Sequence, residues 1–374
     1  MLECFATITP GLEAIAQAEL EDLGLEGLVA TEGGFEFQAD IESLVALNLW
    51  SRTASRFLVR LGQFTTRKLG ELEARAAKLP WRHYLDGKHP IRLRASCKRS
   101  KIYHTGAVIE RVARSIESVV GTSITLVKGE SDESQEQLVL VRIMDDLVVI
   151  SIDTSGAHLH KRGYRQAVAK APLREHLAAA FILMTGWDGS TPFYDPMTGS
   201  GTLPIEAALW AANQAPGLTR SFAMERWPCV PPKLITRARS DAKASLNTGH
   251  LPPILGFDRN PGAIQAAQSN AERAGLPSLT FDQAPLSASA QIISDEPGLM
   301  LVNPPYGLRI GEATKLRNLY DSLGKCVNGP LAHWEVGVIS ANRDLLKRLP
   351  PDLSALGAPV FHGGTRIYFH VRKA

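Results

Sequence analysis

Short apolar runs and helical patterns alternate through the second half of the chain, and this alternation constrains the fold more than any other feature. Five runs have the length and composition of buried strands, and helical patterns lie between them. The expected strands are Phe193–Tyr194, Ile254–Phe257, Leu279–Phe281, Leu299–Val302 and Val336–Ile339, with helices near 201–213, 261–274, 312–327 and 343–349. Such alternation is typical of a parallel, doubly wound sheet.

The first half of the chain is expected to form two smaller α+β domains, residues 1–55 and 56–157. The expected elements are strands at Glu3–Thr9, Gly34–Gln38, Phe57–Phe64 and Ile91–Cys97, helices at Leu12–Leu23, Ile41–Leu49, Leu69–Leu79 and Ala107–Val120, and a hairpin of Leu138–Ile143 with Leu147–Ile152 turned at Asp145-Asp146. Residues 158–374 form the third expected domain. It opens with a basic linker, 158–171, that leads into a helix at Leu173–Thr185, and it contains a proline-rich insertion near 215–253.

Length and composition indicate a globular protein with more than one core. The chain has 374 residues, of which 44% are hydrophobic, so two or three domains of roughly 100–200 residues are expected. The four cysteines are scattered without a CxxC pair, which predicts neither a disulfide framework nor a metal site. The apolar segment around His176–Trp187 is shorter than the roughly 18–20 residues that span a bilayer. We therefore expect a reduced, cytoplasmic protein with no membrane role.

Charge is distributed unevenly along the first third of the chain. Residues 1–50 contain ten Asp or Glu and no Lys or Arg, whereas residues 51–114 contain sixteen Lys or Arg and four Asp or Glu. A basic block of this density indicates an anionic partner, most commonly nucleic acid, although a solvated charged face is the alternative. The candidate contacts are Arg52, Arg56, Arg92, Arg94, Lys98, Arg99 and Lys101, and the basic linker adds Arg162 and Arg165.

A glycine loop follows the first expected strand of the third domain. Gly199 and Gly201 have no Cβ, so the backbone can bend tightly and a ligand can approach the first amides of the next helix, although such a pair alone is often only a turn. Pro204 replaces the third glycine of the dinucleotide fingerprint, which disfavours a pyrophosphate ligand. A sulfonium amino-acid cofactor suits the loop better, with Asp195 near its ammonium group. The candidate residues are Asp195, Pro196, Met197, Thr198, Gly199, Ser200, Gly201 and Thr202.

Acidic residues end the next two expected strands. Asp258 is placed to hold ribose hydroxyls, and Asp282 is placed to accept a hydrogen bond from an adenine amine. The ribose carboxylate usually lies about 20 residues beyond the loop, and the insertion near 215–253 explains the longer gap here. A helix cap at Asp258 is the alternative. This second group of cofactor candidates comprises Asp258, Arg259, Asn260, Asp282 and Gln283.

The tetrapeptide Asn303-Pro304-Pro305-Tyr306 follows the apolar run that ends at Val302. Its two prolines fix two φ angles and remove two N–H donors, so backbone carbonyls lie as acceptors next to the Asn303 amide. Such acceptors suit the exocyclic amine of a nucleobase, because they localise its delocalised lone pair, and Tyr306 can stack on the base. An ordinary turn is the alternative for this segment taken alone. Asn303, Pro304, Pro305 and Tyr306 are the candidate catalytic residues.

The chain resembles class I S-adenosylmethionine-dependent methyltransferases that act on exocyclic amines. These enzymes share the order of three features found here, namely the loop at 195–202, Asp258 and the tetrapeptide. Within them it is most similar to the THUMP-domain RNA guanine-N2 methyltransferases, above all the bacterial 23S rRNA enzymes with a single methyltransferase domain. The resemblance includes Lys161–Arg165, Ala171–Glu175, Ile205–Ala208, Ala215–Leu218, Glu225–Trp227 and Gly307, and in the first half Gly11–Glu13, Glu19–Leu20, Gly33–Gly34, Leu47–Trp50 and Arg52–Arg56. It therefore covers essentially the whole chain.

This resemblance implies a Rossmann-like methyltransferase domain preceded by ferredoxin-like and THUMP domains. It also implies S-adenosylmethionine as the cofactor, structured RNA as the partner with rRNA favoured over tRNA, and methyl transfer to guanine N2. A monomer or weak oligomer is expected. Thr198 stands where the family commonly has Cys, a change that we expect to be tolerated. Because the chain ends after one methyltransferase domain, one methylation activity is expected.

Other functions remain open at this point. A tRNA guanine-N2, DNA adenine-N6 or protein-glutamine methyltransferase would use the same tetrapeptide, since it serves any planar amine. A non-catalytic RNA-binding assembly factor would not need the intact set of Asp195, Gly199, Gly201, Asp258 and Asn303. The incomplete dinucleotide fingerprint disfavours a dehydrogenase.

Overall fold

The computed structural model describes the whole chain except residues 128–134, 167–172, 248, 293–295, 307–312 and 374. The chain forms two compact units, and each unit is built from several stretches of sequence. The N-terminal unit comprises Met1–Ile8, Leu20–Leu159 and Gly217–Asp241, and the C-terminal unit comprises Thr9–Glu19, His160–Pro216 and Ala242–Ala374.

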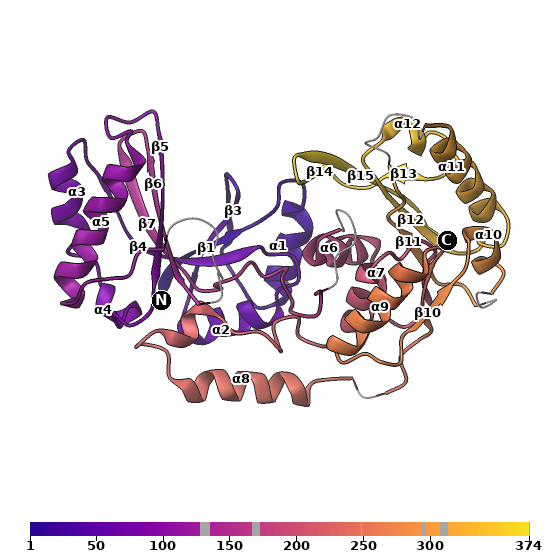
Figure 1. Ribbon diagram of the computed structural model, residues 1–374, viewed down its shortest axis with the longest axis horizontal. Coiled ribbons are helices and arrows are strands. Elements are labelled where there is room, and N and C mark those ends of the chain that lie inside the picture. The colour runs from indigo at the N-terminus through magenta and orange to yellow at the C-terminus, as the bar shows by residue number, and fades with distance from the viewer. Residues whose placement is uncertain (128–134, 167–172, 248, 293–295, 307–312, 374) are drawn as a thin grey trace. The chain divides into compact units, whose positions relative to one another are not determined.

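A seven-stranded sheet with the order β2-β3-β1-β4-β7-β6-β5 forms the N-terminal unit (Figure 1). Its strands are β1 (Leu2–Thr7), β2 (Val29–Thr31), β3 (Gly34–Ala39), β4 (Arg56–Thr65), β5 (Ile91–Lys98), β6 (Gln137–Met144) and β7 (Leu147–Asp153). Neighbouring strands are antiparallel, except that β5 and β6 are parallel. Because β4 pairs with β1 on one side and with β7 on the other, the sheet is continuous across the expected domain boundary at residue 55.

The helices of the first half follow the expected pattern. They are α1 (Glu13–Asp22), α2 (Ile41–Trp50), α3 (Leu69–Ala76), α4 (Trp81–Tyr84) and α5 (Thr105–Val120). On α5, Val108, Val112 and Ile116 recur at the spacing of one helical face, and all three are buried. The expected hairpin turn is confirmed, since Asp145 and Asp146 have φ values of 52° and 65° between β6 and β7, as a two-residue turn of this kind requires.

The proline-rich insertion contains regular structure and belongs mainly to the N-terminal unit, although it follows the glycine loop in the sequence. It includes a 3-10 helix, η1 (Ala223–Arg226), and helix α8 (Pro232–Ala244). The indole Nε1 of Trp227 donates to Gln137 Oε1 at 2.7 Å, and its ring meets Tyr84 edge-on with 4.8 Å between the ring centroids. Packing of this large side chain therefore assigns the insertion to a unit that its place in the sequence does not indicate.

The C-terminal unit contains a sheet with the order β10-β9-β8-β11-β12-β15-β13, and β14 pairs with β15. Its strands are β8 (Phe193–Asp195), β9 (Ile254–Asp258), β10 (Thr280–Gln283), β11 (Leu299–Val302), β12 (Glu335–Ser340), β13 (Ser354–Ala355), β14 (Val360–His362) and β15 (Thr365–Arg372). The expected parallel strands β10, β9, β8, β11 and β12 are present. The rest of the sheet is antiparallel, because β15 is reached through a tight turn from β14 rather than through a helical crossover.

Helices cover both faces of this sheet. They are α6 (Glu175–Thr185), α7 (Thr202–Ala211), α9 (Pro261–Arg273), α10 (Leu286–Ser289), α11 (Ala313–Asn328) and α12 (Arg343–Leu346). Figure 1 shows α7 and α9 on one side of the sheet and α10 and α11 on the other. All four residues of β11 are buried, as expected for a strand that is covered on both faces. The doubly wound architecture is therefore confirmed.

Several elements escaped sequence analysis, namely the short strands β2, β13 and β14, the short helices α4, η1 and α10, and the longer helix α8. The strands and longer helices that were expected occur within a few residues of their predicted bounds. Some expected features extend outside the described residues. They are the end of the basic linker, the start of the Ala171–Glu175 motif, Gly307, and the first residue of the helix expected at 312–327. The assignment of residues 56–157 to a THUMP domain stays a prediction.

Candidate active site

Four strand ends bring the expected site residues to one edge of the C-terminal sheet. Strands β8, β9 and β10 end at Asp195, Asp258 and Gln283, and Asn303 directly follows β11. These strands are parallel neighbours in the order β10-β9-β8-β11, so their carboxyl ends lie at the same edge. The glycine loop and the Asn303 segment therefore leave adjacent strands.

Asp195 is a buried carboxylate with few partners. The residue is 1% exposed, and its Oδ1 accepts a hydrogen bond from the Met197 N–H at 3.0 Å. Burial raises the pKa of Asp195 well above its ordinary value, the Met197 N–H lowers it, and the neighbouring Asp258 carboxylate raises it further. Among the described residues, no cation forms an ion pair with Asp195. A cationic ligand would compensate this buried negative charge.

The glycine loop bends where the sequence predicts. Gly199 and Gly201 have φ values of 52° and 83°, in the left-handed region that favours glycine. A Cβ on Gly201 would lie 3.0 Å from the Cβ of Ala267 on α9, whereas a Cβ on Gly199 would meet nothing within 4 Å. Gly201 therefore permits close packing of the loop against α9, and Gly199 borders open space that a ligand can use.

Backbone contacts fix the loop and leave two of its hydroxyl groups unpaired. The Thr198 N–H donates to Phe257 O at 2.8 Å, and Ser200 O accepts from Asn270 Nδ2 at 2.9 Å. Thr198 Oγ1 and Ser200 Oγ are buried and have no hydrogen-bond partner within the described part of the chain. Since buried polar groups are normally paired, both hydroxyls are candidates for contacts with a ligand.

The other residues of the loop support its position. Pro196 is buried, Met197 packs against the core on the α11 side of the sheet, and Thr202 begins α7. The first N–H groups of a helix have no partners within the helix, so the start of α7 can receive an acceptor from a ligand.

Asp258 remains partly exposed and accepts two backbone N–H groups. Its Oδ2 accepts from Gly199 at 3.0 Å, and its Oδ1 accepts from Asn260 at 2.9 Å. Asn260, and not Asp258, caps α9, because the Asn260 side chain accepts from the Gly262 N–H at 2.9 Å. The carboxylate of Asp258 is therefore positioned by the glycine loop itself, with lone pairs left for a ligand.

The remaining cofactor candidates lie at the same edge with exposed side chains. Arg259 follows β9, and Asp282 and Gln283 are the last residues of β10. Gln283 Nε2 donates to Arg259 O at 3.2 Å, which connects the ends of these two strands.

Asn303 presents a buried acceptor without a partner. Its Oδ1 is buried and accepts no hydrogen bond from any residue that the structure describes. Pro304 is buried and Pro305 is exposed, and neither has an N–H group that could bond to a neighbouring carbonyl. A buried acceptor of this kind is available to an N–H group of a ligand.

Tyr306 lies close to a pair of buried hydroxyl groups. The Tyr320 hydroxyl, on α11, is 2.8 Å from Ser340 Oγ at the end of β12. Burial raises the pKa of Tyr320 to about 12, the hydrogen bond with Ser340 lowers it, and the nearby Tyr306 phenol raises it. Burial also raises the pKa of Tyr306. Tyr306 therefore lies near the carboxyl ends of both β11 and β12.

The expected RNA contacts fall into two groups. Arg94, Lys98, Arg99 and Lys101 have exposed side chains on or just after β5, which is an edge strand. Arg52, Arg56, Arg92 and Arg162 are buried, and Arg165 is largely buried.

The structure corrects the prediction for this second group, because carboxylates inside the protein hold most of these guanidinium groups. Arg56 pairs with Asp153, Arg92 Nη2 lies 3.1 Å from Glu136 Oε1, Arg162 Nε lies 3.6 Å from Glu206 Oε1, and Arg165 Nε lies 3.1 Å from Glu175 Oε1. These side chains support the fold rather than an RNA surface.

Sequence analysis also missed polar residues that hold the site from behind. Asn270 on α9 is 0% exposed and donates to Ser200 O, and Glu206 on α7 accepts from the Tyr164 hydroxyl at 2.9 Å. The sequence pattern that could have identified them is a polar residue at a position where a helix is otherwise apolar. Asn270 lies one turn after Ala267 on the buried face of α9, and Glu206 is surrounded by apolar residues in its helix.

The described residues include no helix with the length and apolar character needed to cross a bilayer. They also contain no group of three His, Cys, Asp or Glu side chains arranged to hold a metal ion.

Two known families match this chain. The family described as "RMKL-like, methyltransferase domain" matches residues 162–354, and the family described as "RlmL ferredoxin-like domain" matches residues 3–58. The first match includes every strand end at the edge described above. The second extends from β1 into the start of β4.

Individual proteins show the same similarity over most of the chain. The ribosomal RNA large subunit methyltransferase K/L of Syntrophotalea carbinolica is 36% identical over 93% of this chain and 50% of that protein. The putative RNA methyltransferase YpsC of Bacillus subtilis is 33% identical over 91% of this chain and 88% of that protein. SMU.472, a putative methyltransferase solved as a complex with SAH, superposes with a TM-score of 0.87 at 28% identity and covers 100% of this chain and 98% of that chain.

The coverage of these relatives differs. The chain spans about half the length of the K/L methyltransferase and most of the length of YpsC. The match to the methyltransferase family, at residues 162–354, accounts for more than half of the 374 residues. The chain therefore belongs to the family of RMKL-like methyltransferases.

Proposed function

We propose that the protein transfers a methyl group from S-adenosylmethionine to the exocyclic N2 amine of a guanine in structured RNA, namely 23S rRNA. The observation that carries this proposal is the unpaired, buried Oδ1 of Asn303, which directly follows β11, the neighbour of the strand that leads into the glycine loop. The names of two relatives, a ribosomal RNA large subunit methyltransferase and a putative RNA methyltransferase, support RNA as the substrate.

The residues of the glycine loop fit S-adenosylmethionine. Asp195 offers a buried carboxylate to a cation, Asp258 offers lone pairs to ribose hydroxyls, and Gly199 borders open space. The same loop carries the unpaired hydroxyls of Thr198 and Ser200. SMU.472, which has the same fold, was solved with SAH, the demethylated form of this cofactor. When bound, S-adenosylmethionine supplies an electrophilic methyl group on a positively charged sulfur. Asp282 and Gln283 are assigned to the adenine end.

The Asn303–Tyr306 segment holds the guanine in this proposal. Asn303 Oδ1 and the Pro304 carbonyl accept hydrogen bonds from the N2 amine, which localises its lone pair, and Tyr306 stacks on the ring. The amine proton leaves to water after the nitrogen has become cationic, so no strong base is required. Positioning and placement of charge supply most of the acceleration.

The exposed cations of the N-terminal unit bind RNA phosphates in this proposal. Arg94, Lys98, Arg99 and Lys101 are assigned to this role, because their side chains are exposed on or just after one edge strand. The target guanine leaves its stack to enter the site, as bases do in other enzymes that modify nucleic acids.

Analysis of the methylated nucleoside tests the proposal. The full-length protein is incubated with isotope-labelled S-adenosylmethionine and unmodified 23S rRNA, tRNA or DNA, and the digested nucleosides are separated by mass spectrometry. We expect N2-methylguanosine from 23S rRNA. The same product from tRNA alone would reassign the substrate, and N6-methyladenine from DNA would overturn the proposal. Normal cofactor binding without any methylated nucleoside would favour a non-catalytic RNA-binding factor.

Replacement of Asn303 tests the role of the acceptor. We expect Asn303→Ala to lower kcat by roughly 10²–10³-fold, since it removes a preorganised polar contact to the reacting group. Asn303→Asp keeps an acceptor oxygen and should retain more activity than the alanine variant. Cofactor affinity, measured by calorimetry, should be unchanged in both variants. An alanine variant with near-normal kcat would remove Asn303 from the mechanism.

A further inference from the structure

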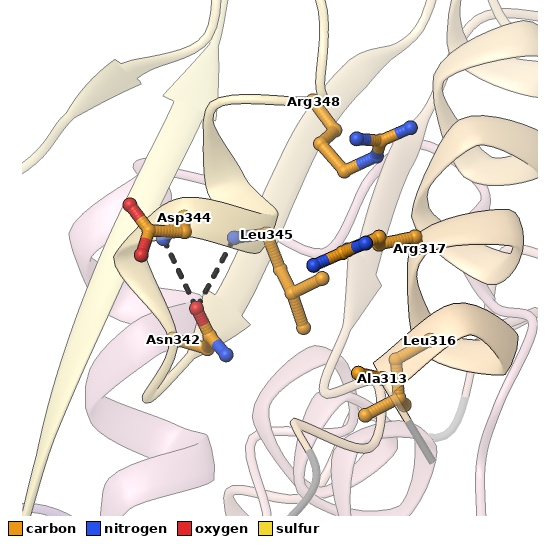
Figure 2. A pocket seen from close by; sticks show the side chains of 7 residues that line it. All are labelled: Ala313, Leu316, Arg317, Asn342, Asp344, Leu345 and Arg348. Carbon is orange, nitrogen blue, oxygen red and sulfur yellow. Dashed lines mark hydrogen bonds between the residues drawn. The ribbon is translucent and has the colours of Figure 1, made fainter. Parts of the chain in front are cut away.

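A pocket of about 510 Å³ lies between α11 and α12 of the C-terminal unit (Figure 2). Its volume falls within the range of roughly 300–1,000 Å³ that is usual for ligand sites. The lining residues used below are Leu316, Arg317, Asn342, Asp344, Leu345 and Arg348. None of these residues belongs to the candidate site derived from the sequence.

The pocket lies one strand away from the Asn303 segment. Strands β11 and β12 are parallel neighbours with Val302 opposite Val338, so the segments that follow them leave the sheet at the same edge. Asn342 lies in the segment that follows β12. On α11, Arg317 is exposed and lies about one helical turn before Tyr320, the buried tyrosine that approaches Tyr306. The pocket and the proposed guanine site therefore lie at the same edge of the sheet, after neighbouring strands.

Donor groups line one part of the pocket and apolar groups line another. Asn342 Oδ1 caps α12 by accepting from the N–H groups of Asp344 and Leu345 at 3.0 and 3.2 Å, which leaves its Nδ2 as a donor. Figure 2 shows the Arg317 side chain extending from α11 toward Leu345. Leu316, which directly precedes Arg317, also lines the pocket. A ligand with an anionic group and an apolar or aromatic part matches this lining.

The net charge of the lining is positive, because its other charged residues have partners. Asp344 Oδ1 accepts from Lys347 Nζ at 2.7 Å, and Figure 2 shows its carboxylate turned away from Arg317. Arg348 forms a two-point contact with Asp321, at 2.8 and 2.6 Å. Among the described residues, no carboxylate pairs with Arg317.

We propose that this pocket binds the RNA nucleotide next to the target guanine. The phosphate contacts Arg317 and Asn342 Nδ2, and the sugar and base lie against Leu316 and Leu345. A guanidinium suits this role because its planar fork donates two hydrogen bonds to one phosphate. The inference rests on the proposed function, since it takes the guanine to enter at Asn303 with its flanking backbone at the same edge.

Arg317→Ala and a matched control, Lys315→Ala, test the site. Lys315 is also an exposed cation on α11, and it lies two residues earlier and hence on a different face. RNA affinity is measured by fluorescence anisotropy with an unmodified 23S rRNA transcript, and methylation kinetics are measured with the same RNA. For Arg317→Ala we expect Kd and KM to rise about tenfold, with kcat and cofactor affinity unchanged, and the slope of log K against log salt to fall by about one. For Lys315→Ala we expect changes below about twofold.

Substitutions at Asn342 separate the donor from the helix cap. Asn342→Ser keeps a good capping residue and removes the Nδ2 donor, whereas Asn342→Asp keeps the cap and places a carboxylate at the phosphate. RNA affinity should fall with serine and fall further with aspartate. Arg317→Lys keeps the charge but loses the two-point contact, so it should restore only part of the affinity lost with alanine.

The outcomes distinguish this inference from the proposed function, because RNA binding is measured without turnover. Equal RNA affinity for Arg317→Ala and Lys315→Ala would overturn the inference, whatever the activity. If the wild-type protein binds RNA without methylating it, the proposed chemistry fails, but an affinity loss specific to Arg317→Ala still supports the site. A wild-type protein that binds no RNA would overturn both.

Discussion

Two buried aspartates end strands in the two units of this protein, and their surroundings differ. Asp153 ends β7, is 0% exposed, accepts two backbone N–H groups at 2.9 Å and pairs with Arg56. Asp195 ends β8, is 1% exposed, and accepts the Met197 N–H without a cation among the described residues. A buried carboxylate whose charge is balanced within the protein supports the fold. One that lacks a cation suits a ligand that supplies it.

Two amides in the same units repeat this contrast. Gln137 is buried, and its side chain accepts from Trp227 and donates to the carbonyls of Leu138 and Asp153. Asn303 Oδ1 is buried and has no partner among the described residues. The buried side chain of Gln137 is thus saturated with hydrogen bonds, whereas Asn303 keeps an acceptor for the proposed ligand.

Removal of the balanced carboxylate should produce the largest effect. Asp153→Ala leaves Arg56 buried without its partner, and breaking a buried pair in this way typically costs about 3–5 kcal/mol. Urea unfolding should show this loss in the N-terminal unit. The cofactor affinity of the fraction that remains folded should not change. A loss below about 1 kcal/mol would mean that Asp153 does not support the fold as its contacts indicate.

The unbalanced carboxylate should respond in the opposite direction. Asparagine has almost the same shape as aspartate but carries no charge, so Asp195→Asn should raise the Tm of the cofactor-free protein. It should also lower affinity for S-adenosylmethionine by roughly 10–100-fold, as expected for a lost charge-assisted contact. Calorimetry and thermal melting measure the two effects. Asp22→Asn, at an exposed position on α1, serves as the control. Unchanged cofactor affinity would reject the role of Asp195.

The pH dependence of cofactor binding should follow from the raised pKa of Asp195. Because the pKa in the folded, cofactor-free protein lies above the ordinary value of 3.8, this group favours folding below the ordinary value, and that contribution is lost as pH rises through the raised pKa. Affinity for a cationic cofactor changes with the opposite sign and should fall as pH is lowered through the raised pKa. Calorimetric titrations of the wild type at several pH values should show this fall, and Asp195→Asn should lack it.

The smallest effects should come from exposed cations. Arg94 and Arg92 lie two residues apart on β5, but Arg94 is exposed and Arg92 is buried against Glu136. Arg94→Ala should weaken RNA binding a few-fold and change stability by less than about 0.5 kcal/mol. Arg92→Ala should destabilise the N-terminal unit, as measured by urea unfolding. Equal stability of the two variants would contradict the distinction between exposed and buried arginines.

Local patterns predicted most of the C-terminal sheet and the position of its candidate site. The run Leu299–Val302 is buried at every residue, and the polar residue that follows it lies at the edge where parallel strands place binding groups. The glycines at 199 and 201 have the left-handed conformation that only glycine adopts readily. These features depend on neighbours in the sequence, so the sequence alone is sufficient to predict them.

Features that depend on distant partners could not be predicted in the same way. Counting charges identifies a basic block but does not distinguish Arg92, whose partner Glu136 is far along the chain, from Arg94. The insertion appeared as a proline-rich stretch because the packing of Trp227 against Tyr84 leaves no local pattern. The pocket at Arg317 depends on two helices that meet only after folding.

The chain passes repeatedly between its two compact units, and this interleaving limits how the protein can be divided. A fragment that ends at Leu159 lacks the segment Gly217–Asp241, and with it the indole that meets Tyr84. A fragment that begins at His160 carries that segment without the sheet that it belongs to, and lacks Thr9–Glu19. No single cut in the chain yields two complete units. Protein engineering by fusion or domain exchange must therefore transfer both units together.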